Sequence, residues 1–185
     1  MGMTLLLPGC GLREHPVTQP SSLPPSTRAD VADLIEVPCE YTITEFSPPE
    51  PDLNTVDPDF DIIGGVVALR TSETAGYVAQ VSALDLYDDP TLRLAAKTPI
   101  LVRRGATFEL RVSSSFHDRV ALDYGRSPPS LRAAFGPCES ETEWLLFTGY
   151  LWVADPECIT LEVALPDSTV EGRKLGLGAP CPGES

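Results

Sequence analysis

The sequence predicts an all-β domain, a sandwich or a barrel, behind a disordered N-terminal tail. Short apolar segments rich in Val, Ile, Leu and aromatic residues recur beyond residue 33, turn residues separate them, and none shows a long helical periodicity. The 185 residues are enough for one domain with a buried core and a tail. The segments are 34–46, 62–70, 77–84, 99–103, 107–113, 119–124, 144–154, 158–165 and 173–177.

The first ten residues predict a truncated signal segment. Their apolar run ends in Leu7-Pro8-Gly9-Cys10, which resembles the lipobox of bacterial lipoproteins, where the cysteine thiol receives a lipid. The run is shorter than a normal signal core and no basic residue precedes Cys10, so a start further upstream would complete the signal. An ordinary tail with a chance cysteine is the alternative. We expect a lipid on Cys10 to be the chain's only membrane contact.

Residues 11–33 predict a linker. They are rich in Pro, Ser and Thr and contain few apolar residues. Such a segment is semi-extended, and at about 3.1 Å per residue residues 11–30 would span roughly 60 Å. We therefore expect a tether that holds a folded domain, residues 34–185, away from a membrane.

The first pair of neighbouring strands that the sequence predicts is a hairpin of residues 108–124. Phe108, Leu110 and Val112 alternate with polar residues, as do Val120, Leu122 and Tyr124. Pairing residue 108 with residue 124 puts all six apolar side chains on one face.

Two short helical turns are also expected. One covers residues 91–97, after the cap residues Asp89-Pro90, and the other covers residues 129–135, before Gly136-Pro137.

The run 144–153 is the most apolar part of the chain. Apolar residues occupy both of its faces, which predicts a central strand buried on both sides. The alternative is that Tyr150 and Trp152 are exposed and form a binding patch.

The last two segments predict a second hairpin, joined by the polar loop 166–172. A pairing centred on that loop puts Cys158 opposite Cys181 and favours a disulfide, whose loop closure stabilises by roughly 3 kcal/mol. If the apolar residues at odd positions are to share one face, the numbers of any two paired residues must add up to an even total. The numbers of the two cysteines add up to an odd total. A bulge near Gly176 or Gly178 would absorb the extra residue.

The cysteines beyond the tail indicate the compartment. Cys39, Cys138, Cys158 and Cys181 are even in number and contain no C-x-x-C spacing. Two disulfides in an oxidising compartment are the simplest account, with Cys39 bonded to Cys138 by elimination. Four buried free thiols in a cytosolic protein are the alternative.

A series of short motifs runs along residues 99–182. They are Arg103-Arg104-Gly105-x-x-Phe108-x-Leu110-x-Val112, Val120-Ala121-Leu122-x-Tyr124-Gly125, Phe135-Gly136-Pro137-Cys138, Trp144, Phe147-Thr148-Gly149, Pro156-x-Cys158 and Leu177-Gly178-x-x-Cys181-Pro182. Together they resemble a group of secreted lipoproteins from GC-rich Gram-positive bacteria. The resemblance implies an immunoglobulin-like antiparallel β-sandwich and an extracytoplasmic location, and it implies no catalytic residue.

The charge balance excludes several classes of partner. Lys and Arg number 13 against 27 Asp and Glu, a net charge of −14, so a phosphate backbone would be repelled and we expect no nucleic-acid partner. A polybasic contact with anionic lipid is excluded for the same reason. Only 2 histidines are present, which leaves little room for a histidine-rich metal site, and we expect no cofactor.

Residues 113–118 contain Ser, His and Asp, the side chains of a hydrolase triad. A triad needs groups that converge from separate elements, whereas Ser115 and His117 share one hairpin tip. We therefore expect a solvated turn, with a small serine hydrolase as a distant alternative.

The acidic segment around Asp57, Asp59 and Asp61 is a candidate calcium site. An EF-hand needs glycine at the sixth position and glutamate at the twelfth, and this chain has Ile62 and Ala68 there. A calcium-dependent adhesion-like module that uses another geometry stays open. Our main expectation is a non-catalytic extracytoplasmic protein of the bacterial envelope, a binding or structural module with an unknown protein or envelope partner.

Overall fold

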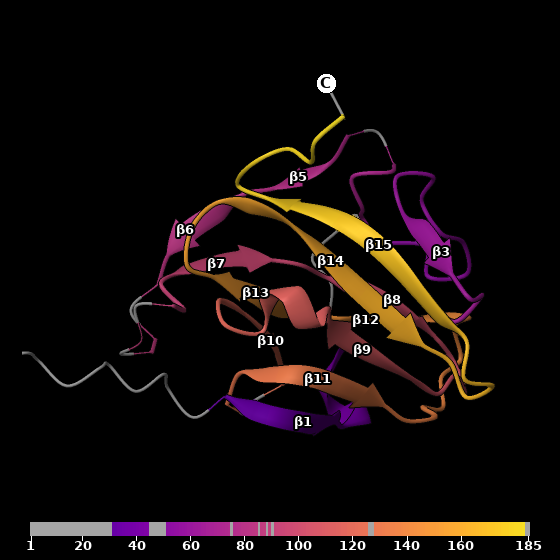
Figure 1. Ribbon diagram of the computed structural model, residues 1–185. Helices are drawn as coiled ribbons and strands as arrows, with labels where there is room; N and C mark the ends of the chain where they lie inside the picture. Colours follow the sequence, from indigo (N-terminus) through magenta and orange to yellow (C-terminus); the bar gives the residue numbers. More distant parts are fainter. Residues whose placement is uncertain are drawn as a thin grey trace, which may run out of the picture.

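The computed structural model describes residues 31–44, 51–74, 76–84, 86–87, 89, 91–125 and 128–183 (Figure 1). Cys10, the expected signal segment and the linker as far as residue 30 lie outside the described residues. The first strand begins at Ala32, close to the domain start expected at residue 34.

The described residues form an all-β fold of two sheets, as predicted, with ten strands in the larger sheet and five in the smaller one. Two short 3₁₀ turns, Cys39–Tyr41 and Ser114–Phe116, interrupt the strands. The larger sheet contains β1 (Ala32–Val37), β5 (Val78–Ala79), β6 (Val81–Ala83), β7 (Leu94–Lys97), β9 (Phe108–Val112), β10 (Val120–Tyr124), β11 (Ser130–Phe135), β13 (Gly149–Val153), β14 (Glu157–Ala164) and β15 (Val170–Leu177). The smaller sheet contains β2 (Thr42–Ile43), β3 (Asp61–Ile63), β4 (Val67–Leu69), β8 (Ile100–Arg103) and β12 (Trp144–Phe147).

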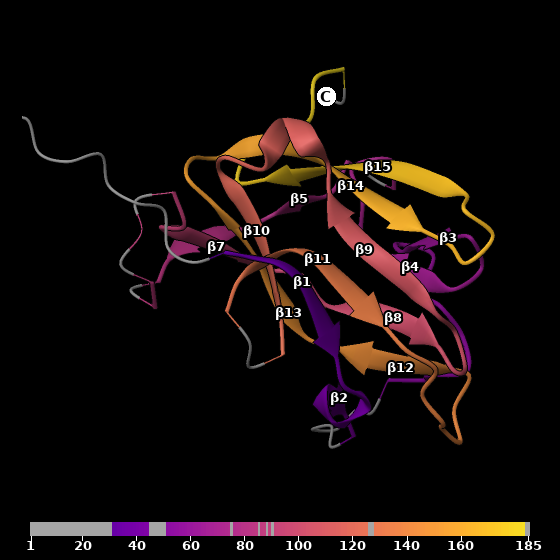
Figure 2. The same ribbon diagram turned by 60° about the horizontal axis from the view of Figure 1, so that its bottom comes forward.

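The larger sheet has the order β5-β15-β14-β9-β11-β10-β13-β7-β6. Strand β1 runs parallel to β11 along its whole length, and the two lie side by side in Figure 2. Only one residue pair, Leu122 with Ser130, joins β10 to β11, whereas β9 pairs with β11 over four residues. The sheet therefore divides into two parts at β11 and curls around the core.

The main core lies between the sheets. Inward positions alternate along the strands, as period-two geometry requires, so Phe108, Leu110 and Val112 are all buried, and so are the alternate residues of β10. Phe135 stacks on Phe108 with ring centroids 4.8 Å apart and meets Phe147 edge-on at 5.4 Å. The six apolar residues predicted to share one face are therefore buried as expected.

The predicted pairing of β9 with β10 is wrong. Strand β11 lies between them in the sheet order, and β9 also pairs with β14. The connection between the two strands contains the 3₁₀ turn Ser114–Phe116, which carries the chain across instead of folding it back into a tight hairpin. Alternation identified the buried face of each strand correctly but did not identify its neighbour.

Both predicted helical turns are also wrong, because strands occupy these segments. Residues 94–97 form β7 and residues 130–135 form β11. Asp89 does act as a local cap, since its Oδ1 accepts a hydrogen bond of 2.7 Å from the backbone N–H of Thr91. The turn is closed by a hydrogen bond of 3.0 Å from the Leu92 N–H to the Asp89 carbonyl, and β7 then begins and pairs with β13.

The apolar run 144–153 is divided between the sheets, which corrects the prediction of one central strand. Its first part is β12 in the smaller sheet and its second part is β13 in the larger sheet, with a change of sheet at Thr148. Both faces of each part are covered nonetheless. The outer side chain Trp144 packs in a small cluster with Ala68 and Leu101, and Trp152 in another with Leu92, Ala95 and Ala121.

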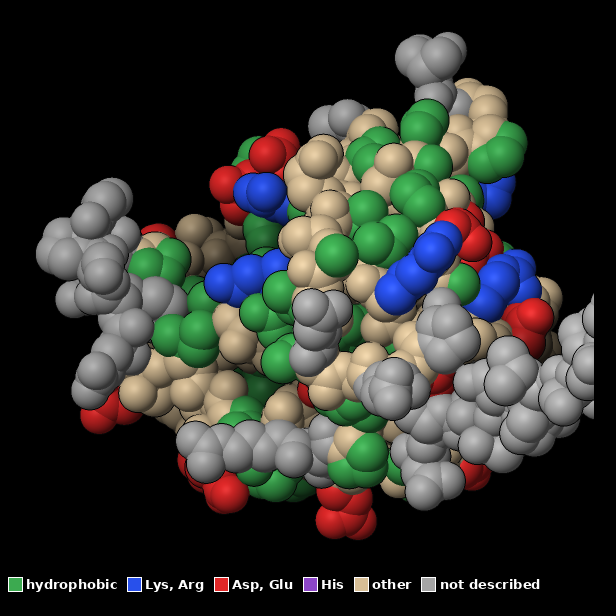
Figure 3. All heavy atoms as spheres, turned by 90° about the vertical axis from the view of Figure 1, so that its left-hand side faces the viewer, with side chains coloured by type: hydrophobic (Ala, Val, Ile, Leu, Met, Phe, Trp, Pro, Cys, Tyr) green, Lys and Arg blue, Asp and Glu red, His purple; other side chains and the backbone are tan. Residues whose placement is uncertain are grey.

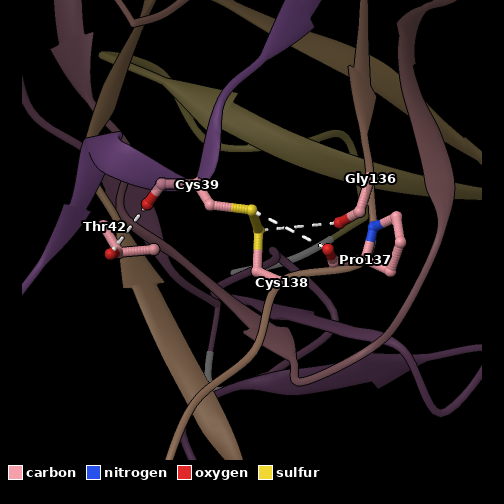
Figure 4. Close-up of a disulfide and its surroundings, with 5 residues drawn as sticks. All are labelled: Cys39, Thr42, Gly136, Pro137 and Cys138. Carbon is pink, nitrogen blue, oxygen red and sulfur yellow. Dashed lines mark hydrogen bonds between the residues drawn. A yellow bond between two sulfur atoms is a disulfide. The ribbon is translucent and has the colours of Figure 1, made fainter.

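Both predicted disulfides are present: Cys39–Cys138 and Cys158–Cys181. Figure 4 shows the first beside Gly136 and Pro137, with the Thr42 hydroxyl donating a hydrogen bond of 2.9 Å to the Cys39 carbonyl. The second forms without the predicted strand register. Cys158 is opposite Gly176, so the register is one that keeps the odd-numbered apolar residues on one face. After Leu177 the chain turns at Gly178, whose φ is +67°, and this turn brings Cys181 back to Cys158.

Candidate functional site

The serine–histidine pair of the hydrolase alternative lies in a described part of the chain and is not joined by a hydrogen bond. His117 Nε2 lies 2.9 Å from the backbone oxygen of Val112, so its ring is held against its own loop. The neighbouring Asp118 pairs with Arg119 Nη1 at 2.7 Å, and that nitrogen also donates to the Ser115 carbonyl at 3.0 Å. Among the hydrogen bonds of the described residues, none joins the Ser115 hydroxyl to His117, and the segment is a turn tied down by Arg119.

The carboxylates of the three candidate calcium ligands have different partners, and that of Asp59 lies 4.0 Å from Arg70 Nη2. Asp61 Oδ2 accepts a hydrogen bond of 2.7 Å from Arg173 Nε, which links β3 to β15. Asp57 Oδ1 accepts one of 2.8 Å from the backbone N–H of Asp59. Within the described part of the chain, no three Asp, Glu, His or Cys residues gather into a group that could hold a metal ion.

The aromatic candidates Tyr150 and Trp152 do not form an exposed patch. Trp152 is fully buried, and its Nε1–H donates to Asp123 Oδ2 at 3.1 Å. The hydroxyl of Tyr87 donates to the same oxygen at 3.2 Å, and its ring meets Trp152 edge-on with centroids 4.9 Å apart. Tyr150 is half-buried beside them.

Burial governs the protonation of this cluster. It raises the pKa of the Asp123 carboxyl, although the hydrogen bonds from Trp152 and Tyr87 act in the opposite direction. It also raises the pKa of Tyr87 to about 12, and the charge of Asp123 adds to that rise. The two donors and one acceptor fix the loop that carries Tyr87 to the outer surface of β10 and β13.

A groove on the outer side of the smaller sheet is a site that the sequence did not predict. Residues 51–60 cross this side, where Leu53, Val56 and Phe60 pack around Leu101 and Trp144. The groove measures about 510 Å³. Its lining consists of Pro51, Asp52, Leu53, Thr55, Asp57, Phe60, Arg70, Pro99, Leu101 and Leu146.

Arg70 is the one cationic residue of that lining. It directly follows β4, and its guanidinium carbon lies 5.1 Å from the ring centroid of Phe60 and 5.6 Å from that of Tyr77. Its nearest carboxylate is Asp59, whose Oδ2 is 4.0 Å from Arg70 Nη2. The Arg70 side chain is 41% exposed, so part of the guanidinium faces solvent.

A second, smaller cavity of about 40 Å³ lies behind Arg70, between the sheets. It shares Arg70 and Pro99 with the groove and is otherwise lined mainly by apolar side chains. The hydroxyl of Tyr124 reaches it and donates to the Thr98 carbonyl at 2.8 Å. Arg70 therefore lines both the groove and this smaller apolar cavity.

Sequence reasoning missed this site because its parts are far apart in the chain. Phe60 precedes β3, Arg70 and Tyr77 lie in the connection from β4 to β5, and other lining residues come from β8 and β12, so no motif spacing marks them. An arginine directly after the buried strand Val67–Leu69 was the only local signal.

No protein-family model matches this sequence, and a search of curated proteins finds no similar sequence. In the described part of the chain, no helix has the length and hydrophobicity needed to cross a membrane. On the face shown in Figure 3, acidic and basic side chains are interspersed with hydrophobic ones.

Proposed function

We propose that the protein is an extracytoplasmic lipoprotein of the bacterial envelope, anchored through a lipid on Cys10, and that its domain is a non-catalytic binding module. Residues 11–30 would then serve as the tether between the lipid and the first strand. The proposed partner is a protein or another envelope component and not a nucleic acid, in keeping with the net charge of −14.

The disulfides are the observation that carries this proposal. Cys39 follows the first strand of the domain and Cys181 follows the last, and each is bonded to a cysteine elsewhere in the chain. Disulfides form and persist in oxidising compartments, and chain ends are where domains fray and are cut by proteases. Covalent fastening of both ends suits a domain that works outside the cytoplasm.

The binding role rests on the groove under residues 51–60. Apolar side chains, two carboxylates and a partly exposed arginine converge there. Small-molecule sites commonly combine an apolar lining with a few polar groups that fix orientation.

An immunoglobulin-like sandwich is the architecture that we propose for this module. Antiparallel pairing dominates both sheets, a core lies between them, and the first strand adds in parallel to β11. The division of the larger sheet at β11 would correspond to the change of layer.

Mass spectrometry tests the proposal. The chain is expressed from its own gene, with the upstream sequence, in a Gram-positive host, and the membrane fraction is analysed. We expect the N-terminal peptide to begin at Cys10 and to carry a lipid, and Cys10→Ser to release the protein from the membrane. A chain that retains an unmodified Met1 would overturn the lipoprotein proposal.

A further inference from the structure

We propose that Arg70 binds the carboxylate of a small apolar ligand seated in the groove under residues 51–60. The inference names a ligand class for the proposed binding role and rests on it, but it does not depend on the lipid anchor.

Arg70 differs from the other arginines in the described part of the chain. Its guanidinium donates none of the hydrogen bonds found there, and its Nε–H is buried without an acceptor; the Nε–H of Arg132 is buried without one as well, but Arg132 Nη2 donates to Asp33. Every other described arginine donates at least one, to a carboxylate or to a backbone carbonyl: Arg93, Arg103, Arg104, Arg111, Arg119, Arg132 and Arg173.

The donor capacity of Arg70 is therefore unused. The Asp59 carboxylate, at 4.0 Å, is too far for a hydrogen bond and is itself 61% exposed. A buried donor without an acceptor is unfavourable, so an acceptor supplied by a ligand would remove that cost. A ligand carboxylate fits best, because the planar guanidinium presents two parallel N–H groups to it.

The surroundings of Arg70 orient the side chain in advance. The rings of Phe60 and Tyr77, from connections on either side of β4, both lie within cation–π distance of the guanidinium. Rings packed on a guanidinium restrict its rotation, so less conformational entropy is lost when an anion binds. The arginine is thus held ready for a partner that the described residues do not provide.

The rest of the groove defines the ligand's other end. Leu53, Phe60, Leu101 and Leu146 offer apolar surface, and a volume of about 510 Å³ falls within the range of small-molecule pockets. An aromatic or branched aliphatic group would bury its surface there while its carboxylate meets Arg70.

Two carboxylates in the lining limit the charge of the ligand. Asp52 accepts hydrogen bonds from the Asn54 backbone at 2.9 Å and the Thr55 hydroxyl at 3.2 Å, and the first of these lowers the pKa of Asp52 and keeps it ionised. Asp57 also lines the groove. These charges repel a ligand with several negative groups, so we expect a monocarboxylate to bind better than a phosphorylated compound.

Nuclear magnetic resonance titration of the intact domain tests the inference. The probes are phenylacetate, indole-3-acetate, 4-methylvalerate and N-acetylphenylalanine, each paired with its uncharged amide. The reporter is the Arg70 Nε–Hε signal, identified by its loss in Arg70→Met, and binding to that variant is followed through the backbone amide signals of the groove lining. Arg103→Met is the matched control, because this arginine lies in the same sheet, is paired with Glu143 and does not line the groove.

We expect at least one acid to shift the Arg70 signal at millimolar concentration. The wild-type domain should bind the corresponding amide at least about tenfold more weakly than the acid, and Arg70→Met should bind the acid at least about tenfold more weakly than the wild type does. Arg103→Met should bind the acid as the wild type does. Equal binding of acid and amide to the wild-type domain would by itself overturn the inference, whatever the variants show. So would the failure of all four acids to shift the signal. Either result leaves the Cys10 test of the proposed function unaffected.

Discussion

Asp123 shows how one buried polar residue holds a loop on the sheet. Its Oδ2 accepts hydrogen bonds from Trp152 and Tyr87, so a carboxylate on β10 joins β13 to the segment before β7. Burial raises the pKa of this carboxyl, which means that the folded chain binds its proton more tightly than the unfolded chain. The contribution of Asp123 to stability is therefore most favourable below its ordinary pKa of 3.8 and is lost as the pH rises through its higher folded pKa.

Substitution of Asp123 separates its charge from its hydrogen bonds. Asp123→Asn keeps an acceptor oxygen and cannot ionise, so we expect its free energy of unfolding, relative to wild type, to rise as the pH increases from 3.8 to neutrality. Asp123→Ala leaves two donors unpaired and should lose about 1–3 kcal/mol at neutral pH. Urea unfolding across this pH range checks both. A pH-independent difference between Asn and Asp would contradict the burial of the charge.

Gly149 illustrates close packing at the change of sheet. A Cβ at this position would overlap the buried ring of Tyr124 and press on the Asp123 carbonyl. We expect Gly149→Ala to cost roughly 1–3 kcal/mol, because the Tyr124 ring must shift in a filled core. Gly136→Ala is the control, since that position has open space and no left-handed φ, and it should be nearly neutral. Equal thermal stability of the two variants would contradict the packing described here.

Residue-level expectations succeeded where chemistry is local and failed where it is not. The expected hairpin around residues 166–172 brought Cys158 and Cys181 together, and the other two cysteines could then be paired by elimination. Apolar residues on both faces of 144–153 predicted burial, and Trp152 is buried, whereas the groove beside Arg70 depends on a loop that covers the outer side of the smaller sheet. No periodicity within a strand shows which loop will cover it.

Among the elements, β14 and β15 were predicted well because their turn is short. They pair over eight residues, with Ile159 opposite Leu175, and this register keeps the odd-numbered apolar residues on the inner face. The prediction of Cys158 opposite Cys181 failed because the disulfide forms after the strand ends. Burial of one face therefore determined the register, and the disulfide followed from the turn at Gly178.

Strands β9 and β10 were harder to predict because their pairing is not sequential. Alternation identifies a half-buried strand but not its neighbour, so a nearby strand in sequence was assigned and β11 was missed. Helix-start and helix-stop residues around β7 and β11 were outweighed by ladder hydrogen bonds with strands distant in sequence.

The link between β3 and β15 gives a test at this scale. Asp61 and Arg173 are each about four-fifths buried, and their 2.7 Å hydrogen bond joins the edge of the smaller sheet to the larger one. We expect Asp61→Asn to lose about 2 kcal/mol of unfolding free energy, with or without calcium. The control Asp59→Asn, at an exposed position, should change it by about half a kcal/mol or less. A rise in melting temperature on addition of calcium that Asp61→Asn abolishes would instead identify a calcium site.

For the whole molecule, the pattern of short apolar segments predicted the fold class, while topology required long-range pairing. The two-sheet all-β fold follows from short apolar segments and turns, whereas the division of the larger sheet at β11 leaves no mark in the sequence. The groove beside Arg70 arises only when residues 51–60 fold across β4 and β8. Local sequence patterns thus predict the all-β class and the disulfides. The candidate site could not be predicted from them, because it forms only when distant segments come together in the fold.

Both disulfides imply that this domain matures in an oxidising compartment. Peptide mapping without reduction, on protein taken from its own cells with thiols blocked at lysis, checks this inference. We predict linked peptides for Cys39–Cys138 and Cys158–Cys181. Free, alkylated thiols at all four positions would contradict the inference.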